Sequence, residues 1–418
     1  MLNIVGLRLT FHKQFHSKRR VYIHTKFNNN PDSISLWEVA KTCLAATRVA
    51  VSSFYRDGPL RKDWNLSYQA TRFALKAFMK AMMETGGDPF VHTIQRLTIQ
   101  PIPTSSELKI VSEPQSFLPD TEVIEFIKTK APADWPDVAD ERPPVYGEWL
   151  TVSDSNPDTI VYLLHGGAYM SGSIQFHRRL GLSIAKNAKC SVYGINYRLA
   201  PQNPYPCALI DAISGYKFLL EKYESKKIII AGDSAGGGLS IATTIALRNM
   251  GVPLPGGVFA ISPWIDVSGT FTDHQSDHDF DFLPNILPDS RIGDRVQYYI
   301  PNQFAKIPYV SPYWQEDFEN LPPLLIQYGG VEKLKDEIEE FVKKVNGKWP
   351  HVTAEIYQDH IHDFQLFDFM KGSTIAIQRA GDWINYVTNN DLTKSNHPQT
   401  QYLMDFNGNE LSANENRD

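Results

Sequence analysis

A serine flanked by glycines lies near the middle of the chain, in the run Gly232-Asp233-Ser234-Ala235-Gly236. The residues before it, 228–231, are apolar and typical of a buried strand, and those after it are typical of a helix. A serine on such a sharp strand-to-helix turn is forced into a strained backbone conformation that exposes its hydroxyl, and the glycines keep Cβ atoms out of the crowded turn. The pattern predicts that Ser234 is a nucleophile.

A serine hydroxyl is a weak nucleophile until a base removes its proton, and folds with this turn supply an acid and then a histidine later in the chain. The loop after the last predicted strand holds two histidines, His360 and His362. The strand before that one is followed by Glu332 and Asp336. Position along the chain therefore leaves two candidates for the base and two for the acid. Asp336 also suits a structural role as a charge at a helix N-terminus.

A glycine-rich loop, His165-Gly166-Gly167-Ala168-Tyr169, follows another predicted strand. An oxyanion that forms during acyl transfer needs backbone N–H donors that side chains do not obstruct, and a Gly-Gly-Ala loop at a strand end supplies them. We expect the amides of Gly166, Gly167 and Ala168 in this loop to form an oxyanion hole, with Gly167 and Ala168 as the main donors. The amide of Ala235 is the expected partner from the serine turn.

The elements that must position these residues are short β-rich runs that alternate with helical ones after Pro144. The predicted strands are 147–152, 159–164, 190–196, 227–231, 257–262, 324–328 and 352–357. The predicted helices between them are 176–187, 207–223, 235–250 and 334–345. Repeated βα units predict an α/β fold with a mostly parallel sheet covered by helices on both faces. In such sheets, sites form beyond the carboxyl ends of the strands.

These motifs resemble the hormone-sensitive-lipase-like family of α/β-hydrolases, which includes carboxylesterases, arylacetamide deacetylases and fungal sterol deacetylases. The resemblance covers roughly residues 144–386 and implies an α/β-hydrolase fold with a helical cap. It is carried by the following segments, in this order: 165–169, Tyr197-Arg198-Leu199-Ala200-Pro201 with Tyr205-Pro206, 232–237, and the C-terminal acid and histidine.

The resemblance also chooses between the open candidates. The family's pattern of histidine, any residue and phenylalanine selects His362 over His360. In the family, the acid stands two residues before a leucine and four before an Asp-Glu pair; Glu332 occupies that place, where an aspartate is commoner. The chain departs from the family at Ala168, where many members carry a third glycine, although an alanine still offers its amide. The implied triad is Ser234, His362 and Glu332.

The resemblance implies a serine hydrolase that cleaves carboxylic esters through an acyl-enzyme, without a metal or an organic cofactor. Its expected substrate is a small or medium acyl group on an apolar alcohol, and sterol acetate is one candidate. An amidase or deacetylase acting on aryl amides is an alternative within hydrolysis. A non-catalytic small-molecule binding module is an alternative from another class, because related folds have lost the histidine and become receptors.

Three regions are expected along the chain. Residues 1–100 form an N-terminal arm and helical cap, with helical apolar spacing between Ser35 and Met83. Residues 101–388 form the α/β-hydrolase core, interrupted by an acidic cap or lid insertion at about 267–313. Within it, His274 and His278 have the spacing of two metal ligands, but no apolar pattern supports a helix, and a solvated acidic lid loop is expected. Residues 389–418 are polar and are expected to be disordered.

The composition of the chain limits the classes of molecule expected to bind it. Among the 418 residues, 42% are hydrophobic and 21% charged, and the net charge of −6 favours neither nucleic acid nor an anionic membrane as the main partner. The three cysteines, at wide spacings, suggest neither a disulfide framework nor a zinc site. The expected partner is a small apolar ester, and the oligomeric state is left open.

The first 31 residues carry six basic side chains and no acid, among apolar residues. This segment is interpreted as a basic arm lying on the fold, with a membrane-surface or organelle-targeting segment as the alternative. The expected location is intracellular, either cytoplasmic or peripheral to an intracellular membrane.

Overall fold

The computed structural model describes residues 2–4, 7–9, 36–84, 108–132, 142–271, 280–283, 297–390 and 400–411. The chain divides into two compact units, Met1–Pro101 and Ile102–Asp418. Among the described residues, no helix has both the length and the apolar character needed to cross a bilayer.

The first unit contains the predicted helices. Helix α1 (Leu36–Asp57) and helix α2 (Leu66–Glu84) pack against each other, and β1 (Leu2–Ile4) pairs with β2 (Leu7–Leu9) in an antiparallel hairpin. The turn between the helices contains Gly58 at φ 85°, a conformation that favours glycine. Tyr68 of α2 is fully buried, and Gln69 Nε2 donates a hydrogen bond to Ala50 O at 3.3 Å. Apart from the hairpin, the basic segment 1–31 lies outside the described residues.

The second unit is built on a nine-stranded sheet with the order β11-β10-β9-β8-β7-β5-β6-β4-β3. Its strands are β3 (Leu108–Phe117), β4 (Val145–Val152), β5 (Asn156–Leu164), β6 (Cys190–Asn196), β7 (Ile228–Asp233), β8 (Gly257–Ile261), β9 (Leu324–Gly329), β10 (Val352–Tyr357) and β11 (Thr400–Met404). In this sheet the β3–β4 and β4–β6 pairings are antiparallel and the others are parallel, so the mostly parallel sheet predicted from the βα alternation is confirmed.

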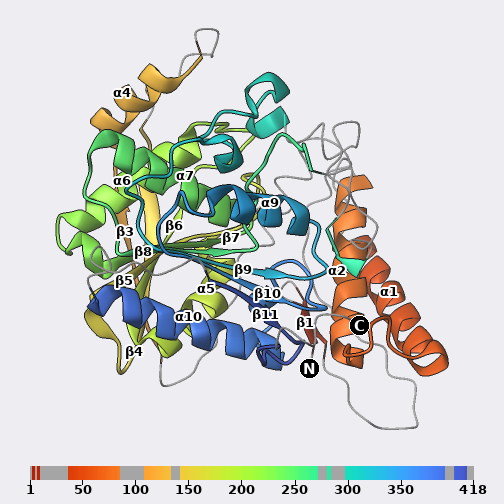
Figure 1. Ribbon diagram of the computed structural model, residues 1–418. Coiled ribbons are helices and arrows are strands. Elements are labelled where there is room, and N and C mark those ends of the chain that lie inside the picture. The colour runs from red at the N-terminus through yellow and green to blue at the C-terminus, as the bar shows by residue number, and fades with distance from the viewer. Residues whose placement is uncertain are drawn as a thin grey trace. The chain divides into compact units, whose positions relative to one another are not determined.

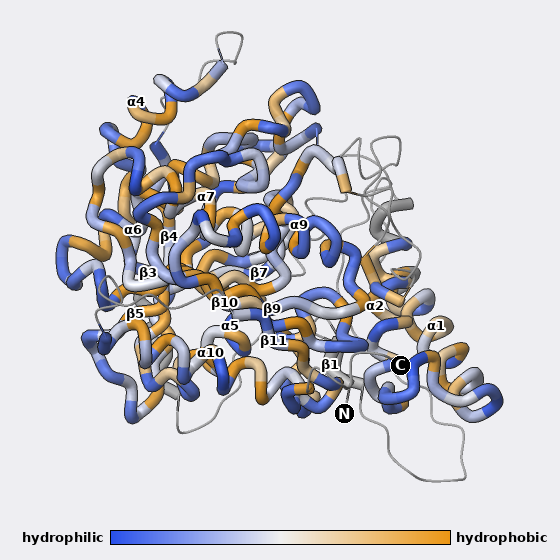
Figure 2. Tube along the Cα trace, in the orientation of Figure 1, coloured by the Kyte–Doolittle hydropathy of each residue, from blue (hydrophilic) through white to orange (hydrophobic). Residues whose placement is uncertain are grey.

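Helices cover both faces of this sheet (Figure 1). They are α4 (Thr121–Lys130), α5 (Ile174–Ala188), α6 (Cys207–Leu220), α7 (Ala235–Met250), α9 (Lys335–Val345) and α10 (Lys371–Asn389). Side chains of a strand point alternately to opposite faces. Tyr162 of β5 therefore joins the core under α6 and α7, whereas Val161 and Leu163 join the core under α5 and α10. Apolar residues concentrate on the strands, and hydrophilic ones dominate the connecting loops (Figure 2).

The strand order reverses at β5. The chain passes from β5 to β6 on one side and then returns to place β7 on the other side of β5. Ligand sites in open α/β sheets form at such a switch point, beyond the carboxyl ends of the strands. The loop after β5 and the turn after β7 are the expected oxyanion loop and serine turn, so the topology brings these two segments together.

The C-terminal tail differs from the expectation of disorder. Residues 400–404 form β11, which pairs in parallel with β10 from Thr353↔Thr400 to Tyr357↔Met404. The polar segment that follows is ordered by Asp405, whose Oδ1 accepts the amides of Asn407 and Asn409. A free strand edge offers unpaired N–H and C=O groups to another strand, so the tail needed few apolar residues to become ordered. Residues 391–399 and 412–418 lie outside the described residues.

Candidate active site

Ser234 lies on the turn between β7 and α7 and has φ 52° and ψ −120°. A positive φ is strained for a residue with a Cβ atom and persists only where the surroundings enforce it. The Ser234 amide donates to Ile261 O at 2.8 Å, and its carbonyl accepts from Trp264 N at 2.8 Å. Its side chain is half-buried between two buried neighbours. The turn therefore presents the hydroxyl, as the motif predicts.

The glycines at either end of the motif fit this turn for a steric reason. A Cβ atom at Gly232 would collide with the carbonyl of Gly236, and one at Gly236 would collide with the carbonyl of Leu164. The ends of β5 and β7 approach this closely because Leu164 is the register partner of Gly232. The serine turn and the oxyanion loop thus pack backbone to backbone.

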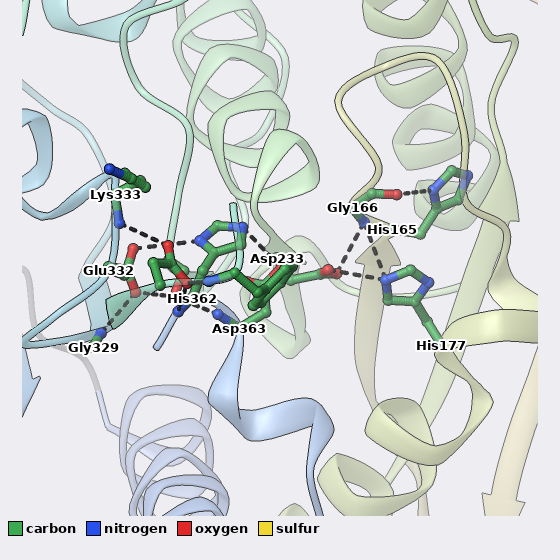
Figure 3. Close-up of polar contacts among 12 residues, drawn as sticks. His165, Gly166, His177, Asp233, Gly329, Glu332, Lys333, His362 and Asp363 are labelled. Atoms are coloured by element: carbon green, nitrogen blue, oxygen red, sulfur yellow. Dashed lines mark hydrogen bonds and ion pairs between the residues drawn. The ribbon is translucent and has the colours of Figure 1, made fainter. Parts of the chain in front are cut away.

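The expected base and acid are brought together from two different loops. His362 follows β10, Glu332 follows β9, and His362 Nδ1 lies 3.5 Å from Glu332 Oε1 with both side chains buried (Figure 3). Glu332 Oε2 accepts from Ser262 Oγ at 2.6 Å and from the Gly329 amide at 2.7 Å. These bonds fix the carboxylate. The Nδ1–Oε1 distance is long for a hydrogen bond, as catalytic hydrogen bonds often are without substrate.

The other nitrogen of His362 has a partner that the sequence did not indicate. Nε2 lies 3.1 Å from Asp363 Oδ2, and among the described residues no hydrogen bond joins it to Ser234 Oγ. Burial opposes the charge on His362, but Asp363 and then Glu332 outweigh it and raise the pKa of His362 well above its usual value. Burial has the opposite effect on the carboxyl group of Asp363 and raises its pKa to about 7. Asp363 has φ 50°, and a sequence pattern does not reveal such a backbone turn.

His360, the rival base, lies in different surroundings. Its ring stacks on Phe406 at 4.5 Å between centroids and packs 4.2 Å from Phe364, and Nε2 donates to Phe406 O at 2.9 Å. Burial lowers the pKa of His360 to about 4. The rival acid, Asp336, lies in the first turn of α9, a position that suits its alternative role as a helix charge.

The amides of the oxyanion loop are not equivalent. The Gly166 amide donates to Asp233 Oδ1 at 3.0 Å, so this N–H is used inside the fold. The amides of Gly167 and Ala168 donate no hydrogen bond among the described residues. Ala235 is the first residue of α7, where amides lack an intrahelical partner. The geometry leaves Gly167, Ala168 and Ala235 as the candidate donors and gives Gly166 a positioning role.

Asp233 and His177 form a buried ion pair that the sequence did not indicate. Asp233 Oδ2 lies 2.9 Å from His177 Nε2 (Figure 3). His177 Nδ1 donates to Ser173 O at 2.9 Å. Burial opposes the charge on His177, but Asp233 outweighs it and raises its pKa. Since Asp233 also accepts the Gly166 amide, this pair connects the serine turn to the oxyanion loop. The only sequence signal was the position of Asp233 beside Ser234.

The acidic insertion departs in part from the expected solvated loop. His274, His278 and their acidic neighbours lie outside the described residues, but Asp281 is described and fully buried. In the part of the chain that the structure describes, no group of three or more metal-ligating side chains could hold a metal ion.

The chain is similar to known hydrolases. A family model described as "alpha/beta hydrolase fold" matches residues 160–366. An acetyl-hydrolase from Streptomyces hygroscopicus is 32% identical over 59% of this chain and 81% of that protein. An esterase from Acinetobacter venetianus is 30% identical over 56% of this chain and 76% of that protein.

The chain is also similar in fold to solved structures. A crystal structure of EstE5 soaked with p-nitrophenyl butyrate superposes with a TM-score of 0.58 at 26% identity, covering 76% of this chain and 99% of that one. An esterase of the bacterial hormone-sensitive lipase family superposes with a TM-score of 0.59 at 24% identity, covering 87% of this chain and all of that one.

Proposed function

This chain belongs to the hormone-sensitive-lipase-like family of α/β-hydrolases, a family of esterases and lipases, and on that premise we propose that it hydrolyses carboxylic esters with Ser234, His362 and Glu332 as its catalytic triad. One observation carries the proposal. A serine strained at φ 52° stands at the topological switch point of a sheet whose later loops pair a buried histidine with a buried glutamate. A structural role alone does not require this combination.

The proposed reaction is acyl transfer in two halves. His362 Nε2 accepts the Ser234 proton as Oγ attacks the ester carbonyl carbon, and the resulting oxyanion takes hydrogen bonds from Gly167, Ala168 and Ala235. Collapse of the intermediate breaks the bond to the alcohol, which leaves with the proton from His362. Water then attacks the acyl-enzyme, again with His362 as base, and the bond to Ser234 Oγ breaks as His362 returns the proton to Oγ and the acid is released. Glu332 holds the imidazole in the tautomer that leaves Nε2 free to accept a proton.

Before that step, His362 must exchange one partner for another. Its Nε2 lies beside Asp363 in this structure, and the proton transfer requires it to face Ser234. A small rotation of the imidazole or of Asp363 is therefore part of the proposed cycle. Because the pKa of His362 is raised, the protonated imidazole is favoured, and it must lose this proton before it can act as a base.

The proposed substrate is an ester with a small or medium acyl group on an apolar alcohol, with sterol acetate as a candidate. Two similarities support a short acyl group: a relative is named an acetyl-hydrolase, and EstE5 was soaked with a butyrate ester. Aryl amides are the alternative substrate, because the same acyl-enzyme chemistry cleaves them once the leaving amine is protonated.

Turnover of a nitrophenyl ester series from acetate to palmitate tests this proposal, with an acetylated arylamine measured beside it. We expect the highest kcat/KM between acetate and butyrate, and loss of turnover in a folded Ser234→Ala variant. Faster cleavage of the amide than of every ester would favour the deacetylase alternative. A folded wild-type protein that cleaves neither would leave a binding module as the better explanation.

We also propose an intracellular location, either cytoplasmic or peripheral to a membrane. All three cysteines, Cys43, Cys190 and Cys207, are free thiols, which is typical of a reducing compartment. The basic residues of segment 1–31 would provide the membrane contact. Flotation with anionic vesicles should then be lost on deleting residues 1–31, and flotation unchanged by that deletion would contradict the contact. That the N-terminal helices form a cap stays a prediction, tested by the activity and melting of a chain lacking residues 1–85.

A further inference from the structure

One buried carboxylate from the acidic insertion touches both loops that carry the proposed acid and base. Asp281 Oδ2 accepts the Lys333 amide at 2.8 Å, and Oδ1 accepts the His362 amide at 3.2 Å and the Phe282 amide at 2.7 Å. The side chain is fully buried. Lys333 is the residue after Glu332, so Asp281 connects the backbone of one loop to the backbone of the other.

These contacts bear on the geometry of the triad. Glu332 and His362 come from separate loops, and their side chains meet only at the 3.5 Å Nδ1–Oε1 contact. A hydrogen bond to a charged carboxylate is stronger than one between neutral groups. Two such bonds from one side chain fix the separation of the two loops more firmly than the long side-chain contact does. The two loops are also joined directly, because the Val331 amide donates to His360 O at 3.1 Å, and Asp281 adds a connection that reaches the amides of Lys333 and His362.

Asp281 also belongs to the set of charges that faces the imidazole. Glu332 faces the His362 ring from the loop after β9 and Asp363 from the loop of His362 itself. Asp281, from residues 280–283, accepts the His362 backbone amide and interacts with the charge on the ring. Burial raises the pKa of Asp281, an effect that the positive charge of His362 opposes. By reciprocity, a charged Asp281 favours the protonated form of His362.

We propose that Asp281 is a positioning residue of the active site, which holds the acid loop and the base loop in register through their backbone amides. The inference rests on the proposed function of His362 and Glu332. It assigns to the insertion a part in catalysis. A change in the conformation of residues 280–283 would alter the geometry of the triad.

The test compares Asp281→Asn with a matched control, Asp266→Asn. An asparagine at 281 keeps the shape but replaces one acceptor oxygen with an NH₂ group, which faces a backbone N–H and repels it. Asp266 is also buried and also accepts backbone amides, those of Ser268 and Thr270, but it contacts neither triad loop. Both variants lose a buried acceptor, so their difference separates positioning from general stability. Asp281→Ala is a second variant in case the asparagine prevents folding.

Two readouts are measured on the full chain with p-nitrophenyl acetate and with ¹³C-labelled histidine. We expect Asp281→Asn to lower kcat roughly 10–100-fold with KM nearly unchanged, because a small misplacement of catalytic groups is costly. The NMR titration of His362, assigned with a His362→Ala sample, should move to lower pH in Asp281→Asn and stay in place in Asp266→Asn.

The His362 titration does not depend on turnover, so failure of the proposed esterase function can be distinguished from failure of the proposed role of Asp281. A wild-type protein without esterase activity would contradict the proposed function, and the His362 titration would still report on Asp281. Equal kcat in Asp281→Asn and Asp266→Asn, or an unchanged His362 titration, would overturn the positioning role.

Discussion

Two histidines stand two residues apart in one loop, both buried, and the structure gives them opposite surroundings. His362 lies among carboxylates, with Glu332 at one ring nitrogen and Asp363 at the other. His360 lies between the rings of Phe364 and Phe406 and donates to a backbone carbonyl. The pKa of the first is raised well above its usual value, and that of the second is lowered to about 4.

The difference shows that segments from neighbouring strands act together with Asp363 and Phe364 of the loop itself to give the two histidines different surroundings. The loop after β9 supplies Glu332 to one side of the histidine loop, and the C-terminal segment after β11 supplies Phe406 to the other. A buried imidazole beside carboxylates can carry a positive charge through a reaction, whereas one enclosed by apolar rings stays neutral. The comparison therefore predicts which of two identical side chains acts as the base.

The largest effect should come from the histidines themselves. His362→Ala should lower kcat by about 10³–10⁶-fold, since the Ser234 hydroxyl then keeps its proton and only binding and the oxyanion hole remain. His360→Ala should lose less than about tenfold in kcat and show its effect mainly in melting temperature. The turnover of p-nitrophenyl acetate by each variant, measured after circular dichroism has shown that it is folded, decides which histidine is the base. If His360→Ala were the more damaging change, the comparison would be reversed.

The second-largest difference in kcat is expected between substitutions of the two candidate acids, Glu332 and Asp336. Glu332→Gln keeps the shape of the side chain but removes the charge that orients the imidazole, and we expect kcat to fall about 10²–10⁴-fold. Asp336→Asn should alter stability by less than about 1 kcal/mol through the lost charge at the N-terminus of α9 and leave kcat close to that of the wild type. Steady-state kinetics and urea unfolding on both variants measure this. A greater loss of kcat in Asp336→Asn would transfer the acid role to that residue.

The pH profile should sharpen the contrast through Asp363. A base must be neutral to accept a proton, so kcat/KM should rise with pH through the pKa of His362, which its carboxylates hold above the usual value. Asp363→Asn removes one of those charges from Nε2, so the acid limb should move to lower pH. A limb that stays in place, or moves to higher pH, would show that Asp363 does not control the protonation of His362.

The smallest effect on turnover is expected on the His360 side. Phe406→Ala removes a buried ring that stacks on His360, which should destabilise the protein by about 3 kcal/mol. Its kcat should fall less than tenfold, because the ring stacks on His360, which is not the proposed base. Phe369, whose side chain is half exposed, is the control, and Phe369→Ala should change stability by less than about 0.5 kcal/mol. Loss of kcat comparable to that of His362→Ala would mean that the C-terminal segment belongs to the catalytic machinery.

Sequence reasoning succeeded where the signal is local. The βα alternation predicted the mostly parallel sheet, and the Gly-x-Ser-x-Gly motif placed Ser234 on a strand-to-helix turn, because turn sterics are encoded within five residues. It missed Asp363 and Asp281, whose roles depend on a positive φ and on loops far apart in the chain. It also missed β11, since a strand that completes an existing edge needs little apolar patterning of its own.

The most direct test of the account is the rate at which a fluorophosphonate modifies the protein, followed by intact mass and mapping of the modified residue. Tryptic cleavage yields residues 228–248, which contain Ser234 and the buried Ser240, so fragmentation must distinguish the two. We predict a single label on Ser234, formed at nearly the wild-type rate in His360→Ala and at least about a hundredfold more slowly in His362→Ala. A label on another serine, or equal rates in the two histidine variants, would contradict the triad.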